Sequence, residues 1–174
     1  RKHNFDMLRQ AENMDLLLMD SLPKNAGIVR IHVAGDFFSA AYMQAWWLTA
    51  SENPNTLFYA YTKSLPYWDS VINEMPILDN FILTASYGGR ADHMISELGL
   101  RSTTVVYSEA EKLGLEIDHD DSHAARPSLR NQDFALLIHG TQPKGSEAAT
   151  ALKALKGKGS YSRKNNKKGL KMIV

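Results

Sequence analysis

Five short β-type segments, each closed by a polar tip, constrain the fold of this chain more than any other feature. Branched and aromatic side chains dominate them, and several are near-continuous apolar runs, as expected of strands that are covered on both faces. The segments span residues 28–33, 57–61, 81–85, 103–107 and 134–138.

Helical patterns separate these segments. Apolar residues recur at helical spacing from Phe5 to Met19, and Ser39 is placed to cap a helix that Pro54 ends. Strands that alternate with helices favour a mostly parallel sheet built from βα units. We therefore predict an α/β fold, either a partial (β/α) barrel or an open doubly wound sheet. The later helices are expected over residues 40–51, 67–74, 91–98 and 146–155.

The segment from Glu116 to Gln132 breaks this alternation, because it is densely polar and shows no obvious element of its own. Loops of this length are often functional or mobile. Imidazoles and carboxylates crowd within it, and such side chains bind zinc, iron or manganese when the backbone turns them inward. His119, Asp121 and His123 are therefore candidate metal ligands, although their spacing matches no zinc-protease motif and a solvated polar loop is the alternative.

The charge of the chain is divided unevenly along its length. Its 174 residues correspond to about one domain, and the basic composition of the end separates a single α/β domain at 1–156 from a tail at 157–174. Eight Lys and Arg residues follow from Lys153 onward, and no acid follows Glu147. A flexible basic arm suits contact with nucleic acid phosphates, while a solubilising terminus is the plainer reading.

Absent features exclude several classes of protein. The chain has no cysteine, so these residues form no disulfide, offer no thiol nucleophile and hold no Cys-ligated zinc or iron–sulfur centre. No apolar run approaches the roughly 18 residues that a spanning helix needs, and no secretory-type segment follows the first residues. We therefore expect no membrane partner and a cytoplasmic location.

Polar residues follow the predicted strands at the edge where parallel α/β sheets bind ligands. After the first strand, Gly35 would let a ligand approach the backbone closely, and Asp36 could accept a hydrogen bond from an amine or a ribose hydroxyl. The alternative is that Asp36 or Ser39 only caps the next helix.

The next strand ends place further candidates beside that pair. Lys63 could bind a carboxylate or phosphate, or act as a base, and Glu109 is the second candidate catalytic residue. A structural ion pair between Lys63 and Asp36 is an equal alternative. Ser86, Gly88 and Gly89 resemble an anion-binding turn, although an ordinary turn would have the same composition.

Four ordered blocks of sequence carry a family resemblance. They cover residues 29–39, 58–64, 118–123 and 134–142, and together they resemble the phage gene product 88 family from about His3 to about Tyr161. Family members have no assigned activity. The resemblance implies a phage protein in the host cell cytoplasm.

The family is itself similar to part of a radical S-adenosylmethionine barrel. That similarity implies that Gly35 and Asp36 stand where such barrels bind the amino group of S-adenosylmethionine, with Ser86 and Glu109 facing the same pocket. The chain departs from the pattern at one decisive point, since it has no cysteine to hold the iron–sulfur cluster.

These observations lead to one main hypothesis and two alternatives. The main hypothesis is a strand-end pocket for a small-molecule or nucleotide-like ligand, in what could be the C-terminal part of a radical S-adenosylmethionine-type enzyme. One alternative is a nucleic-acid-associated phage module that acts through its basic tail. The other is a metal-dependent hydrolase that uses the loop from His119 to His123.

Overall fold

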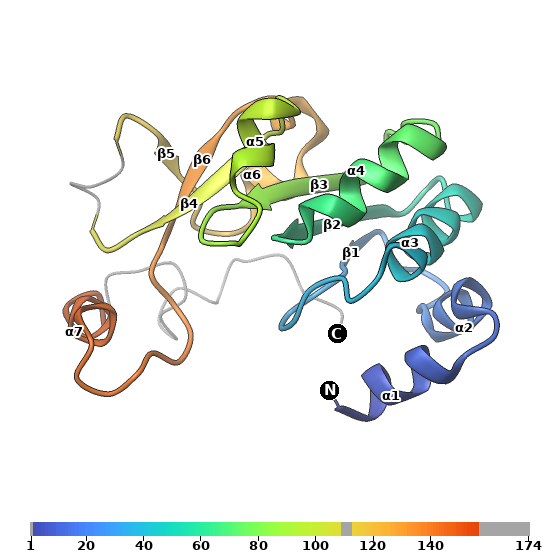
Figure 1. Ribbon diagram of the computed structural model, residues 1–174, viewed down its shortest axis with the longest axis horizontal. Helices are drawn as coiled ribbons and strands as arrows, with labels where there is room; N and C mark the ends of the chain where they lie inside the picture. Colours follow the sequence, from blue (N-terminus) through green and yellow to red (C-terminus); the bar gives the residue numbers. More distant parts are fainter. Residues whose placement is uncertain (1, 109–112, 157–174) are drawn as a thin grey trace.

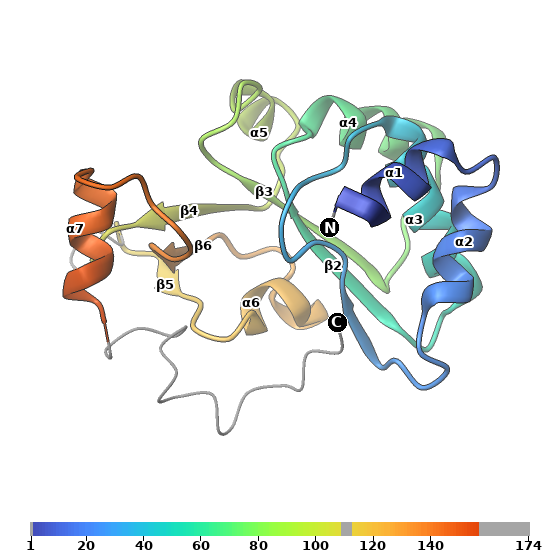
Figure 2. The same ribbon diagram turned by 90° about the horizontal axis from the view of Figure 1, so that it is seen from below.

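An all-parallel sheet curled into a half-barrel organises the molecule. The computed structural model describes residues 2–108 and 113–156, and within them six strands pair in the order β1-β2-β3-β4-β6-β5 (Figures 1 and 2). The strands are β1 (Ile28–Arg30), β2 (Leu57–Thr62), β3 (Phe81–Ser86), β4 (Ser102–Val106), β5 (Glu116–Ile117) and β6 (Phe134–Leu137).

Helices lie on both faces of this sheet. Figure 2 shows α4 and α5 on one side and the short α6 on the other, inside the curl of the half-barrel, while α2 packs on α3. The helices are α1 (Lys2–Gln10), α2 (Met14–Ser21), α3 (Ala40–Glu52), α4 (Leu65–Glu74), α5 (His93–Glu97), α6 (Ser122–Ala125) and α7 (Glu147–Ala154).

The predicted α/β class is confirmed, in the form of a partial barrel. Three details of the prediction are wrong. The first strand ends at Arg30 rather than Val33, because the Ile31 amide makes a last hydrogen bond to β2, at the Tyr59 carbonyl, and Arg30 Nε then donates to the His32 carbonyl. The helical pattern from Phe5 to Met19 forms two helices, α1 and α2, with a break at residues 11–13.

The third error concerns the loop at 116–132, which contains regular structure. It holds β5, the helix α6 and a 3-10 turn at Pro127–Leu129. β5 pairs with β6 through only two residues, Glu116 and Ile117. A strand this short cannot show the alternation by which strands are detected in a sequence.

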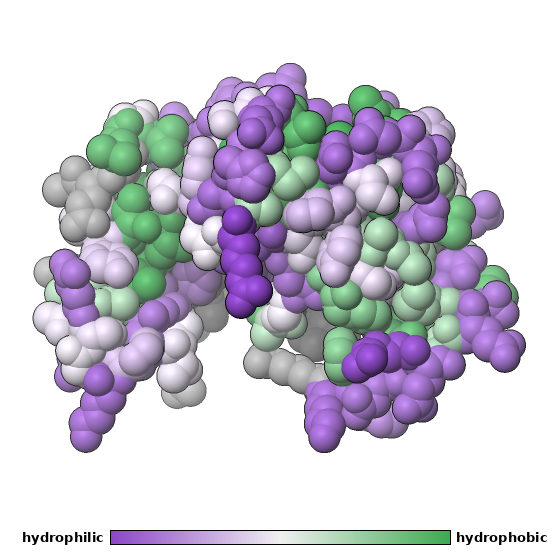
Figure 3. Space-filling view, in the orientation of Figure 1, coloured by the Kyte–Doolittle hydropathy of each residue, from purple (hydrophilic) through white to green (hydrophobic). Residues whose placement is uncertain are grey.

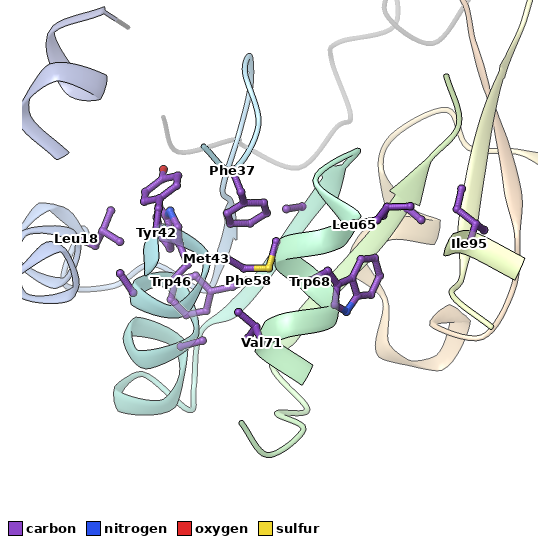
Figure 4. Packing of buried hydrophobic residues seen from close by; sticks show 14 residues of the cluster. Leu18, Phe37, Tyr42, Met43, Trp46, Phe58, Leu65, Trp68, Val71 and Ile95 are labelled. Carbon is purple, nitrogen blue, oxygen red and sulfur yellow. The ribbon is translucent and has the colours of Figure 1, made fainter. Parts of the chain in front are cut away.

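Alternation along β2 sends its side chains to two different cores. Phe58 and Ala60 face the convex side, where α3 and α4 cover them. Figure 4 shows Phe58 and Met43 among Trp46, Trp68 and Val71 in this layer. This core anchors the convex helices to the middle of the sheet.

The concave core is smaller and is closed by α6. Tyr59 and Ile82 pack there with Phe134 and Leu136, against Ala124 and Ala125 of the helix. Both alanines are buried, and their small side chains allow the helix backbone to approach the sheet closely. The segment that breaks the βα alternation in the sequence is therefore the segment that covers the concave face.

Replacement of Phe58 by alanine tests the position of the main core. Phe58 is 0% exposed, so we expect Phe58→Ala to lower the free energy of unfolding by about 3–5 kcal/mol. Urea denaturation measures the loss. Phe5→Ala is the matched control, since Phe5 is 40% exposed, and an equal loss in both variants would contradict this core.

Candidate functional site

Asp36 joins the ends of the first two strands. Its Oδ1 accepts hydrogen bonds from the Phe37 amide at 2.8 Å and from the Thr62 hydroxyl at 2.6 Å, and its Oδ2 accepts one from the Lys63 amide at 2.7 Å. Ser39, not Asp36, caps α3, because its hydroxyl accepts from the Tyr42 amide at 3.1 Å. The carboxylate of Asp36 is thus used to connect two turns.

Lys63 extends this connection to the third strand. Its ammonium donates to the carbonyl of Ser86 at 3.2 Å and to the carbonyl of Tyr87. The side chain therefore makes no ion pair with Asp36 and points instead to the turn after β3. Three predicted site residues, Asp36, Lys63 and Ser86, lie together on one rim at the carboxyl ends of β1, β2 and β3.

The glycine turn after β3 does bind an anion, and the anion is the protein's own. The amides of Gly88 and Gly89 each donate to a carboxylate oxygen of Asp92 at 2.8 Å. A Cβ at Gly88 would lie 3.1 Å from Lys63 Nζ, and one at Gly89 would lie 3.1 Å from Lys63 Cβ. The two glycines therefore leave room for the lysine that crosses the turn.

A charged cluster occupies the concave face below this rim. Arg30 donates to Asp121 Oδ2 at 2.7 Å, and the hydroxyls of Tyr59 and Tyr61 donate to the same carboxylate at 3.0 and 2.9 Å. Asp121 directly precedes α6 and has a left-handed φ of 62°. These bonds attach the start of α6 to β1 and β2.

Asp118 fixes the remainder of the same loop. This fully buried carboxylate accepts hydrogen bonds from the amides of Asp120, Ser122, His123 and Ala124, at 3.2, 3.0, 3.0 and 3.3 Å. The His123 ring lies beside it, with Nε2 3.0 Å from Glu116 Oε2. One buried acid thus organises the turn that brings α6 onto the sheet.

The predicted metal ligands do not assemble in the part of the chain that the structure describes. Asp121 bonds to Arg30 and the two tyrosines, whereas His123 faces Glu116 and His119 is exposed. Across residues 2–108 and 113–156, no three His, Asp or Glu side chains form a group that could hold a metal ion. Glu109 and the basic tail at 157–174 lie outside the described residues.

His32 is a buried imidazole that follows β1. Its ring packs edge-on against Phe37, with centroids 4.6 Å apart, and lies 5.7 Å from the ring of Tyr42. Both ring nitrogens are buried without a hydrogen-bond partner. Burial lowers the pKa of His32, against the opposing effect of Asp36 and with a further lowering by Arg30.

Sequence reasoning missed Arg30 and Tyr61, which lie within the strands rather than after them. Polar residues inside an apolar run belong to the strand itself, so they are not among the residues that follow strand ends. Alternation does carry a signal, because Tyr59 and Tyr61 are two residues apart and therefore share a face of β2. Their phenol hydroxyls indicate that polar groups lie opposite this face of β2 and accept hydrogen bonds from them.

The fold and the rim together define an α/β half-barrel with polar turns joined at the carboxyl ends of its strands. The chain belongs to the gene product 88 family, whose family model matches residues 1–157. This match confirms the resemblance that the four sequence blocks carry. The link to radical S-adenosylmethionine barrels stays a prediction.

A curated relative supports the phage origin of the family. The "Gene 88 protein" of Mycobacterium phage L5 is 35% identical over 72 residues, which cover 35% of this chain and 30% of that protein. The chain thus spans less than a third of that relative's length. No solved structure matches the chain.

The structure also bears on the expectation about membranes. Among the described helices, none combines the length and the apolar character that crossing a bilayer requires.

Removal of the Asp36 carboxylate should loosen the rim. Asp36→Ala deprives three donors of their acceptor, so we expect a loss of about 2–3 kcal/mol in the free energy of unfolding. Asp36→Asn retains one acceptor oxygen and should lose less. Urea denaturation compares the variants, and an unchanged stability in Asp36→Ala would show that these bonds do not hold the rim.

The environment of His32 predicts a stability that depends on pH. Because burial lowers its pKa in the folded state, the unfolded chain takes up a proton first as the pH falls through about 6.5. Stability should therefore decrease between about pH 7 and pH 5, and His32→Phe should remove part of that decrease. Chemical denaturation at both pH values measures it, with His93→Phe on the exposed start of α5 as control. Identical pH profiles in the two variants would refute this role of His32.

Proposed function

We propose that this protein binds a small polar or nucleotide-like ligand at the rim of the half-barrel, where β1, β2 and β3 end. One observation carries the proposal: the turns after these strands form one hydrogen-bonded rim through Asp36, Lys63 and Ser86. In parallel α/β sheets the carboxyl ends of the strands are where ligands bind. S-adenosylmethionine is the first candidate, because the family resemblance implies it.

Lys63 gives the site its preference for an anionic or polar ligand, since the charge of Arg30 is already paired with Asp121. Lys63 is exposed at the rim, so a ligand phosphate or carboxylate can reach its ammonium group. Below it, the Arg30 guanidinium lies 5.2 Å from the centre of the Tyr61 ring, and its side chain is 17% exposed. The Tyr61 ring offers an aromatic surface beside these charges, which suits a nucleoside base or a ribose.

The proposal is limited to binding by the residues of this chain. These residues include no thiolate, so they do not fit a Cys-ligated iron–sulfur cluster. Lys63 acts as a ligand-binding cation in this proposal, and a base role would require a deprotonated ammonium group. Contact of the basic tail with nucleic acid stays a prediction from charge alone.

Replacement of Lys63 tests the rim directly. We expect isothermal titration calorimetry to detect binding of S-adenosylmethionine or ATP to the wild-type chain. Lys63→Met should weaken that binding at least about tenfold, because the ligand loses its cationic partner. Lys63→Arg retains the charge and should bind more tightly than Lys63→Met.

A matched lysine provides the control. Lys24 is exposed before β1, at the opposite ends of the strands, and Lys24→Met removes the same charge from the chain. Thermal melts check that both variants are folded. The proposal fails if neither ligand binds the wild type, or if Lys63→Met and Lys24→Met bind with equal affinity.

A further inference from the structure

A cavity of about 990 Å³ lies where the sheet is incomplete, between β3 and β4. β3 pairs with β2 at five positions from Phe81 to Ala85, but with β4 only at Ala85 and Ser86. The first half of β3 therefore has no strand beside it on the β4 side. The cavity extends from this gap along α4 and α5 as far as Tyr87, whose carbonyl accepts a hydrogen bond from Lys63 at the rim.

The walls of the cavity are mainly apolar. α4 and α5 contribute to its sides, and Figure 3 shows scattered hydrophobic residues among mostly hydrophilic ones at the upper edge of the molecule. Ile72 and Ile77, which also line it, are 42% and 88% exposed. The principal apolar residues are Trp47, Trp68, Phe81, Leu83, Ile95 and Leu100.

Arg101 lines the gap between β3 and β4, and its guanidinium points from there towards α6 on the concave side. Its guanidinium donates to the carbonyl of His123 at 2.9 Å, to the Thr84 hydroxyl and to the carbonyl of Ala124 at 3.5 Å. It lies 5.6 Å from the centre of the Phe134 ring. Every one of these partners is neutral, and Arg101 Nε is buried without any partner.

Arg101 thus lacks a counter-ion within ion-pair distance among the described residues. Arg101 is half-buried, and partial burial of a cation without a paired anion is costly, since the guanidinium gives up hydration and gains no compensating charge. Burial accordingly lowers the pKa of Arg101 to about 10, although Tyr61, Asp118 and Asp133 act in the opposite direction. An anion brought into the cavity would relieve this cost.

Two other charged residues, Arg130 and Asp133, line the cavity. Arg130 pairs with Asp79, at 3.0 Å between Nη1 and Oδ1. Asp133 accepts a hydrogen bond from the Ser102 amide at 2.6 Å. Of the two arginines that line the cavity, Arg101 is therefore the one whose charge is not matched by a carboxylate.

We propose that the cavity between β3 and β4 binds an amphipathic anion, whose apolar body lies on Trp68, Phe81 and Leu100 and whose anionic group meets Arg101. The volume agrees with that of small-molecule sites, which are mostly apolar with a few polar groups that fix orientation. The contact with Arg101 uses neither Asp36 nor Lys63, so the two proposed sites depend on different charged residues, although Tyr87 borders both.

Two fluorescent dyes of nearly the same shape test the charge requirement. 1-Anilinonaphthalene-8-sulfonate carries an anionic group, and N-phenyl-1-naphthylamine is its neutral counterpart. We expect the folded protein to bind one molecule of the anionic dye, and Arg101→Met to weaken this at least tenfold. Binding of the neutral dye should change less than twofold. Arg90→Met is the matched control, because Arg90 is exposed after β3 and does not line the cavity.

A second variant covers the case in which Arg101→Met does not fold. Ser96 is exposed on α5 and lines the cavity, so Ser96→Trp should fill the cavity and weaken both dyes without disturbing the core. Circular dichroism confirms the fold of each variant. Unchanged binding in Ser96→Trp, or equal affinities in Arg101→Met and Arg90→Met, would overturn the proposal. Because neither dye tests the rim, these outcomes leave the rim site to its own experiment.

Discussion

The hydrogen bonds of the Asp36 carboxylate hold together the part of the molecule on which its proposed function depends. β1 is only three residues long, so its pairing with β2 alone gives little control over where the chain goes next. Asp36 supplies that control by accepting from Thr62 and Lys63 at the end of β2. With Lys63 fixed in this way, its ammonium reaches the turn after β3, and three strand ends form one rim.

Curling of the sheet sets apart the two sites that we propose. On the concave side, Asp118 and the contact of Asp121 with Arg30 hold α6 in place. These contacts place polar groups beneath the rim. At the other end, the short ladder between β3 and β4 opens a gap that helices line but no strand fills. One site is polar and lies at the carboxyl ends of the strands, and the other is apolar with a single unmatched charge.

Several side chains show how far the sequence could be interpreted. The turn at Gly88 and Gly89 resembles an anion-binding turn in sequence, with an ordinary turn as the alternative, and its amides bind the carboxylate of Asp92, three to four residues along the chain. The candidate metal ligands Asp121 and His123 bond to different partners: Asp121 to Arg30, which is 91 residues away, and His123 to Glu116, which is seven residues away. In both cases the residue types indicated a polar contact, but the sequence did not indicate which residue would be the partner.

The sequence by itself determined the parallel α/β class and the position of four of the strands, because apolar runs and helical spacing are local properties of the chain. It also determined which polar residues would follow those strands. Only the tertiary structure decided that the polar loop at 116–132 would enter the curl of the sheet, and that Arg101 would be half-buried beside an apolar cavity. The physical reason is that burial and pairing depend on residues brought together from different strands, and no local pattern records which of them will meet.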